Sequence, residues 1–240
     1  MESDTGAVVI VTAAGRRPLP GAASGAVPIV ISPQGSAAAI YTSDTGAIQI
    51  FSGLPAAPQL VRQVSVEAPP LAFAISDDAT RLLTVAKAGL PAETILSYTG
   101  AQPPQTLGHA SGVKSIQFVP GSGDALLSTA ETVLLASTAY GVRTIGDTRI
   151  GLGGVTAVGA FPGGSPILIG TRSGQVILRD LDAGSQTVLT CACVPTAFAP
   201  LRGSGIFRLT ETGAGPLWLL DAASAEPRIL FVAGHGGGSQ

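Results

Sequence analysis

The sequence is poor in charge, and above all in clustered positive charge. Charged residues make up 12% of its 240 residues, and the formal net charge is −2. Lysine occurs only at Lys87 and Lys114, and the only adjacent arginines are Arg16 and Arg17. Binding to nucleic acid needs grouped positive charge that displaces counterions from the phosphates. We therefore expect no nucleic-acid partner.

Long hydrophobic runs are also absent. A membrane-spanning helix needs about 20 consecutive apolar residues, whereas the apolar runs of this chain stop at Gly, Pro or Ser after a few residues. The first residues lack the charged segment and the apolar segment of a signal peptide. These features predict no membrane span. They leave the compartment open, including export of a protein that continues upstream of Met1.

Cysteine occurs only at Cys191 and Cys193. Two cysteines do not make a disulfide framework. In a strand both side chains would face the same way, and two thiolates could hold a soft metal ion. Structural zinc, however, takes about four ligands, and the only histidines are His109 and His235. We expect two small apolar residues in a core rather than a thiol site, and no cofactor.

Residues for catalysis are scarce. The chain contains no asparagine and no G-x-S-x-G nucleophile motif, and His109 is its only histidine outside the tail. Two carboxylate pairs occur, at Asp77-Asp78 and at Asp180 with Asp182. Such pairs can act as general acid and base when burial separates their pKa values, but both lie in turn contexts, where solvated side chains are expected. A catalytic set is therefore hard to assemble.

Glycine and proline, in contrast, are abundant, with 32 and 18 residues, and a repeat runs through the chain. Five similar corners occur at steps of 44, 43, 42 and 38 residues: Ile31-Ser32-Pro33, Ile75-Ser76-Asp77, Phe118-Val119-Pro120, Ala160-Phe161-Pro162 and Phe198-Ala199-Pro200. Short apolar segments separated by turn residues fill each repeat. A period near 40 of this kind is typical of a β-propeller. We therefore predict an all-β propeller of four-stranded antiparallel blades.

The repeat predicts that the chain begins inside a blade. Ser3-Asp4-Thr5-Gly6-Ala7 is identical to the segment 40 residues later, Ser43 to Ala47. We expect one domain over residues 1–233, with 22 strands and a disordered tail at 234–240. It would contain a half blade of two strands at 1–25 and five full blades, at about 26–66, 67–109, 110–151, 152–192 and 193–233.

The half blade has three explanations. The first is truncation at the N-terminus, so that the complete protein is six-bladed. The second is an open or five-bladed ring with the half blade packed outside it. The third is strand addition by another chain at the open edge.

One blade resembles a known repeat. The segment Thr106 to Gly121, with Gly108-His109 near its start, resembles the Gly-His opening and first strand of a WD40 repeat. Leu178-Arg179-Asp180 and Leu219-Leu220-Asp221 resemble its Trp-Asp position without the Trp. The resemblance implies that His109 lies in a loop before a first strand and bonds to Ser128 or Thr129. The chain looks like a degenerate WD40 or YVTN-type propeller of bacterial type.

Equivalent turns suggest a binding face. Asp4, Asp44, Arg172 and Glu211 stand at matching positions in successive hairpins, whose turns in a propeller share one face with the loops that join blades. With His109, they form a possible binding rim. The alternative is that turn tips are polar because they are wet.

We therefore predict a non-catalytic scaffold that binds another protein or a surface ligand through its loop face. Two alternatives remain: an exported, surface-associated propeller, and, less favoured, a propeller hydrolase or lactonase.

Overall fold

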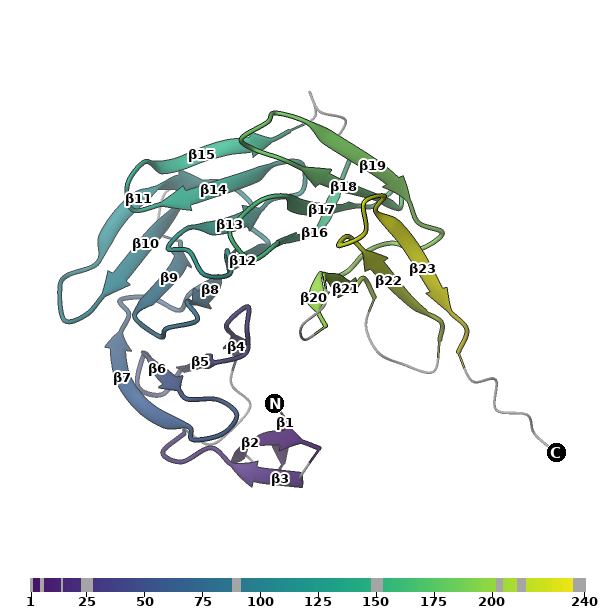
Figure 1. Ribbon diagram of the computed structural model, residues 1–240. Helices are drawn as coiled ribbons and strands as arrows, with labels where there is room; N and C mark the ends of the chain where they lie inside the picture. Colours follow the sequence, from purple (N-terminus) through teal and green to yellow (C-terminus); the bar gives the residue numbers. More distant parts are fainter. Residues whose placement is uncertain are drawn as a thin grey trace. The chain divides into compact units, whose positions relative to one another are not determined.

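The computed structural model describes residues 2–4, 7–13, 15–22, 28–87, 92–147, 153–201, 205–210 and 215–234, with the backbone alone for residues 2–4 and 7. Glu211, His235 and residues 235–240 of the expected tail lie outside the described residues. The described residues form 23 strands and no helix. The strands form six sheets, of which one is a partial sheet and five are blades, numbered here one to five. Figure 1 shows how the strands are grouped.

The strands follow one another in each sheet in chain order. The partial sheet contains β1 (Glu2–Asp4), β2 (Ala7–Thr12) and β3 (Gly15–Pro18). Blade one contains β4 (Ile29–Ile31), β5 (Ala37–Thr42), β6 (Ala47–Ser52) and β7 (Gln59–Ser65). Blade two contains β8 (Ala72–Ile75), β9 (Arg81–Ala86), β10 (Glu93–Thr99) and β11 (Gln105–Ala110). Blade three contains β12 (Ser115–Phe118), β13 (Ala125–Ser128), β14 (Val133–Ser137) and β15 (Gly141–Gly146). Blade four contains β16 (Val155–Ala160), β17 (Ile167–Thr171), β18 (Gln175–Arg179) and β19 (Gln186–Thr190). Blade five contains β20 (Ala199–Pro200), β21 (Ile206–Arg208), β22 (Leu217–Asp221) and β23 (Arg228–Val232).

Burial follows the composition of each strand. Every residue of β5 is buried, and its sequence AAAIYT is almost wholly apolar. The fourth strand of the same blade, β7, reads QLVRQVS and is mostly exposed. A strand with both faces covered needs apolar residues at every position, whereas a strand at the solvent edge does not.

The partial sheet differs from the expected half blade. Two strands were predicted there, but the structure has three, because Glu2, Ser3 and Asp4 pair with Val9, Val8 and Ala7 of β2. The predicted count of 22 strands was therefore one too low for the described residues.

The chain divides into two compact units, and the boundary runs through blade three. Unit 1 consists of Met1–Phe118, Ser122–Ala125 and Ala136–Val142, and unit 2 of Val119–Gly121, Leu126–Leu135 and Arg143–Gln240. In unit 1, blades one and two share a core cluster that includes Ile48, Ile50, Phe73, Ile75 and Leu82. In unit 2, blades four and five share a cluster that includes Ala157, Leu168, Phe198, Phe207 and Leu220. Adjacent blades in each unit are therefore joined by buried apolar side chains.

Polar links add to this packing in unit 1. The backbone N–H of Gln34 in blade one donates to Oδ1 of Asp77 at 2.7 Å. Nη1 of Arg81 in blade two donates to the carbonyl oxygen of Gly123 at 3.2 Å. A Cβ at Gly123 would collide with the Arg81 guanidinium. Each link joins one blade to the next at the corner end of its strands.

One carboxylate of each pair, Asp78 or Asp180, accepts hydrogen bonds within its own turn. Burial alone would raise the pKa of Asp78, but hydrogen bonds from Ser76 and Thr80 outweigh it and lower that pKa. Asp180 accepts the backbone N–H groups of Ala183 and Asp182, which lower its pKa. The turn contexts were predicted correctly. The carboxylates of Asp78 and Asp180 accept hydrogen bonds there, whereas solvated side chains were expected.

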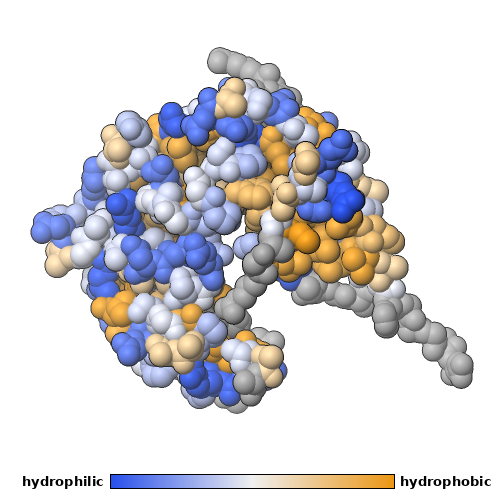
Figure 2. Space-filling model, viewed as in Figure 1, coloured by the Kyte–Doolittle hydropathy of each residue, from blue (hydrophilic) through white to orange (hydrophobic). Residues whose placement is uncertain are grey.

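Blade five exposes apolar side chains in unit 2. Figure 2 shows hydrophobic colour concentrated over β22 and β23. Phe231 is 56% exposed although its ring contacts Trp218, with 4.9 Å between the centroids, and Val232 is also exposed. Trp218 itself packs at the margin of the cluster that blade five shares with blade four.

Candidate functional site

The candidate site lies at one end of each blade, which we call the loop face. In each blade this face is formed by the turn between the second and third strands and by the loop that leads to the next blade. In blade one, Gly46 N–H donates to Ser43 O at 3.3 Å, and Val66 N–H donates to Gly46 O at 2.9 Å. Blade four repeats the pattern: Gly174 N–H donates to Thr171 O at 3.0 Å, and Cys191 N–H donates to Gly174 O at 2.7 Å. Val66 and Cys191 are therefore equivalent, and each begins a joining loop beside a turn glycine.

The predicted rim residues lie at the turn tips where they are described. Asp44 is exposed, and its Oδ1 accepts the Ser43 hydroxyl at 3.2 Å. Arg172 is exposed as well, and its backbone N–H donates to Gly154 O at 2.8 Å. Asp44 belongs to unit 1 and Arg172 to unit 2. Only the backbone of Asp4 is described, and Glu211 lies outside the described residues, so a shared rim stays a prediction.

His109 does not lie where the repeat resemblance implied. It is part of β11, the outermost strand of blade two, and pairs with Thr94 of β10. Its Nδ1 lies 3.3 Å from Thr94 Oγ1, whereas a hydroxyl of blade three was expected as its partner. The cause is the pairing of β11 with β10, which extends to Ala110 and leaves the Gly-His pair inside a strand.

A pocket of about 250 Å³ opens beside Val66 in unit 1. Its apolar wall consists of Val66, Ala68, Ala86 and Leu96, and its polar lining of Glu67, Thr84, Lys87, Thr94 and Tyr98. Thr94, Leu96 and Tyr98 share one face of β10 because side chains alternate along a strand. The pocket therefore combines one joining loop with two strands of the next blade.

The polar groups of this pocket differ in burial. Tyr98 and Thr84 are buried, whereas Glu67 and Lys87 are exposed and carry opposite charges. Burial raises the pKa of the Tyr98 phenol, and the negative charge of Glu67 raises it further, while a hydrogen bond with the Thr84 side chain acts in the opposite direction. The phenol stays protonated at neutral pH. A ligand would meet an apolar body, a neutral hydroxyl and two charges near solvent.

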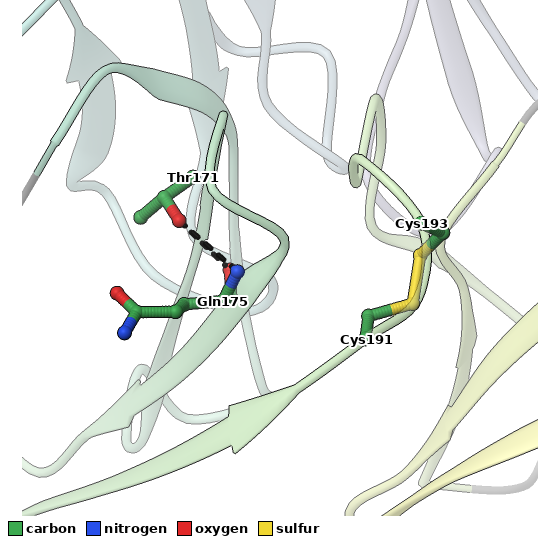
Figure 3. The surroundings of a disulfide bond; sticks show 4 residues. All are labelled: Thr171, Gln175, Cys191 and Cys193. Carbon is green, nitrogen blue, oxygen red and sulfur yellow. Dashed lines mark hydrogen bonds between the residues drawn. A yellow bond between two sulfur atoms is a disulfide. The ribbon is translucent and has the colours of Figure 1, made fainter.

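The two cysteines are joined by a disulfide in unit 2, with 2.00 Å between the sulfurs and 5.0 Å between the Cα atoms (Figure 3). No described cysteine is free. The expectation of two separate thiols, whether apolar core residues or ligands for a soft metal ion, is therefore corrected. The reason is local: β19 ends at Thr190, so the cysteines leave the extended conformation that the prediction assumed.

Backbone packing places this disulfide against the turn of blade four. Gly174 has a φ of +81°, and a Cβ there would come within 2.6 Å of Cys191 O and 2.8 Å of Cys193 O. Cys191 is 5% exposed and packs in the cluster with Phe207 and Leu209. The loop thus folds tightly over a residue that has no side chain.

Sequence reasoning identified the turns but missed the pocket. Glu67, Thr84 and Tyr98 come from three separate segments, and only the three-dimensional pairing brings them together. A signal was present in Thr84, which interrupts the apolar run of β9, RLLTVA. The part of the chain that the structure describes has no helix able to cross a membrane. It also has no group of three or more His, Cys, Asp or Glu side chains placed to hold a metal ion.

Comparison with known proteins bears on the fold. No protein-family model matches the sequence, and no curated protein matches it. A functionally unknown protein from Desulfotomaculum acetoxidans DSM 771 has a similar structure, with a TM-score of 0.61 and 13% identity over 88% of this chain and 70% of that chain. U3-55K is similar with a TM-score of 0.55 and 16% identity, over 83% of this chain and 62% of that chain. The WD40 repeats of RRP9 give a TM-score of 0.55 and 16% identity, over 83% and 61%.

At these identities the likeness concerns the fold alone. The chain spans less than two thirds of the length of U3-55K and of the RRP9 repeats. The fold is an all-β propeller of four-stranded antiparallel blades, with five full blades and one partial blade, and it is similar to WD40 repeat proteins.

Proposed function

We propose that this protein is a non-catalytic scaffold that binds another protein through the loop face of unit 1. The observation that carries the proposal is the pocket between the loop at residues 66–68 and strands β9 and β10. Interface hot spots form where an anchor side chain enters a pocket and loses its water. This pocket offers the apolar wall and the buried hydroxyl that such an anchor needs.

The size of the pocket favours a side chain over a free ligand. Pockets for small molecules usually enclose roughly 300 to 1,000 Å³, whereas this one is about 250 Å³. An anchor with an apolar stem and a polar end fits the lining, because Val66 and Leu96 meet the stem while the Tyr98 hydroxyl and the Glu67 carboxylate meet the end. The engagement of Asp78 and Asp180 in turn hydrogen bonds supports a role without catalysis.

A matched pair of substitutions tests the pocket. Ala86 lines it, and Ala101 is exposed in the turn at the opposite end of the β10–β11 hairpin. A partner captured from the native host, identified and then purified, is titrated by calorimetry against wild type, Ala86→Leu and Ala101→Leu. We expect Ala86→Leu to weaken binding by about 30-fold, the effect of losing a hot spot, and Ala101→Leu to leave it unchanged. Equal affinities for all three proteins would remove the pocket from the interface.

Export is a second candidate, and the disulfide favours it. Disulfides persist in oxidising compartments and are rare in the cytosol, and Cys191 is bonded to Cys193. Under this proposal the native protein is a surface-associated propeller of bacterial type whose chain continues upstream of Met1 into a sixth blade. Fractionation of the host, with N-terminal sequencing and an intact mass of the purified protein, tests it. A reduced protein that begins at Met1 inside the cell would contradict it.

Strand addition at the partial sheet is supported by its strand count. The partial sheet has three strands where the five blades have four, and β1 pairs with β2 on one side among the described strands. A fourth strand, from upstream sequence or from another chain, would restore the blade pattern. Light scattering of the isolated chain tests pairing between copies. A monomer at every concentration would exclude self-addition.

A further inference from the structure

The disulfide has one shielded side and one accessible side. Cys191 is 5% exposed and packs against the apolar cluster of blades four and five. Cys193 borders the same cluster but is only half-buried, and its neighbours Ala192 and Val194 are exposed, Val194 by 45%. Attack on a disulfide depends on which sulfur a thiolate can approach. Because Cys193 is the more exposed of the two residues, we take its Sγ as the sulfur that a thiolate can approach.

The loop is held in place by contacts other than the disulfide. Cys191 N–H donates to Gly174 O at 2.7 Å. Pro195 lies so close to Gly170 that a Cβ there would come within 2.8 Å of the proline Cβ. The disulfide itself closes a loop of only three residues, and short closed loops add little constraint to the chain. Opening the bond therefore leaves the loop and the blade folded.

We propose that Cys191–Cys193 is a thiol–disulfide exchange site, with Cys193 as the sulfur that is attacked and Cys191 as the leaving group. A thiolate attacks Cys193 Sγ, the bond between the two cysteine sulfurs breaks, and Cys191 departs as a thiolate. The product is a mixed disulfide on Cys193. A second thiol then attacks the incoming sulfur and releases Cys193. Two external thiols are oxidised to one disulfide, and the cysteine pair takes up two electrons and two protons.

The reacting partner is a thiol, either a small monothiol of the glutathione type or a protein dithiol. The site lies in unit 2 and uses none of the pocket residues of unit 1. The proposal therefore does not rest on the proposed binding function, and either can fail without the other.

Two single variants test the assignment of the sulfurs. Cys191→Ser leaves the accessible thiol, and Cys193→Ser leaves the shielded one. Each folded variant is incubated with glutathione disulfide, quenched with an alkylating reagent and weighed by mass spectrometry. We expect Cys191→Ser to form the mixed disulfide at least roughly tenfold faster, because exchange rates depend on access to the sulfur. Equal rates, or faster reaction of Cys193→Ser, would overturn the assignment. A melting curve of each variant confirms that it is folded.

The wild-type protein tests the exchange itself. It is incubated without denaturant in glutathione buffers of graded redox potential, and separately with a dithiol such as reduced thioredoxin. Opening in the glutathione series while the protein still shows one cooperative melting transition supports exchange with small thiols. Opening by the dithiol alone assigns a protein dithiol as the partner. A bond that both reagents leave intact until the protein is unfolded would overturn the proposal, and so would a protein purified from an oxidising compartment with two free thiols.

Discussion

Two joining loops, one in each unit, start from the same backbone arrangement but differ in how closely they pack on the turn beside them. Val66 and Cys191 both donate their N–H to a turn glycine, at 2.9 and 2.7 Å. Around Gly46 the nearest atom to an added Cβ is Val66 O at 3.8 Å, whereas at Gly174 it is Cys191 O at 2.6 Å. The loop after Val66 stands away from its turn, and the loop after Cys191 is closed over it.

The side chains that each loop meets on the next blade, blade two or blade five, also differ in how much space they fill. In blade two the loop meets the pair Thr84 and Leu96, and a pocket remains. In blade five Leu209 N–H donates to Trp218 O at 2.9 Å, and both side chains pack with Cys191. Larger side chains and a disulfide fill the space that unit 1 leaves open. The blade backbone thus fixes where a site can lie, and side-chain volume decides whether a site exists.

The largest expected effect comes from replacing the two turn glycines. Both have positive φ, +58° at Gly46 and +81° at Gly174. Gly46→Ala should cost about 1 kcal/mol of unfolding free energy from the left-handed backbone alone. Gly174→Ala should cost about 3 kcal/mol or more, because backbone oxygens also have to move. Urea unfolding of the two variants measures the difference in unfolding free energy. Equal losses would show that the loop over Gly174 moves away from an added Cβ at little cost.

Removal of the disulfide should have a moderate effect. On the chain-entropy account, a closed loop of three residues contributes roughly 1.5 kcal/mol. Cys191→Ala combined with Cys193→Ala, compared with wild type in urea without reductant, checks this value. Since the atoms nearest to a Cβ at position 174 are the carbonyl oxygens of Cys191 and Cys193, the double variant should not rescue Gly174→Ala. Rescue would mean that the disulfide, rather than the backbone, presses the loop onto the turn.

A smaller effect is expected from the buried hydroxyls of the pocket. Tyr98→Phe or Thr84→Val leaves one buried polar group without its partner and should cost about 1 to 2 kcal/mol. The double variant should cost less than the sum, because it removes both groups. Unfolding free energies of the four proteins give the coupling. A coupling of zero would show that the hydroxyls do not depend on each other.

The smallest effect concerns pH. The pKa of Tyr98 is raised in the folded protein, so its phenol ionises less readily there than in the unfolded chain, where the pKa is about 10. Its contribution to stability is complete below about pH 10 and is lost as the pH rises through the folded pKa. Unfolding of wild type and Tyr98→Phe from pH 8 upward should show a steeper loss for wild type. Parallel curves would contradict the shift.

Much of the fold could be predicted from the sequence because it is local. The corners at Ile75 and Phe118 mark hairpins whose strands are neighbours in the chain, so apolar periodicity and turn residues suffice. The errors concern where strands begin and end. His109 belongs to a strand because β10 pairs with it, and Cys191 meets Cys193 because the chain turns after Thr190. The pocket depends on side-chain volumes across three segments, to which no single pattern in the sequence corresponds.

The contact between Arg81 and Gly123 has a consequence for how this sequence can change over generations. A residue with a Cβ at position 123 would occupy the space of the guanidinium, and a shorter residue at position 81 would leave the Gly123 carbonyl without this donor. Neither change is neutral alone. Among descendants and relatives that keep this corner, positions 81 and 123 should therefore be inherited as a pair, with arginine beside glycine or a shorter side chain beside a larger one.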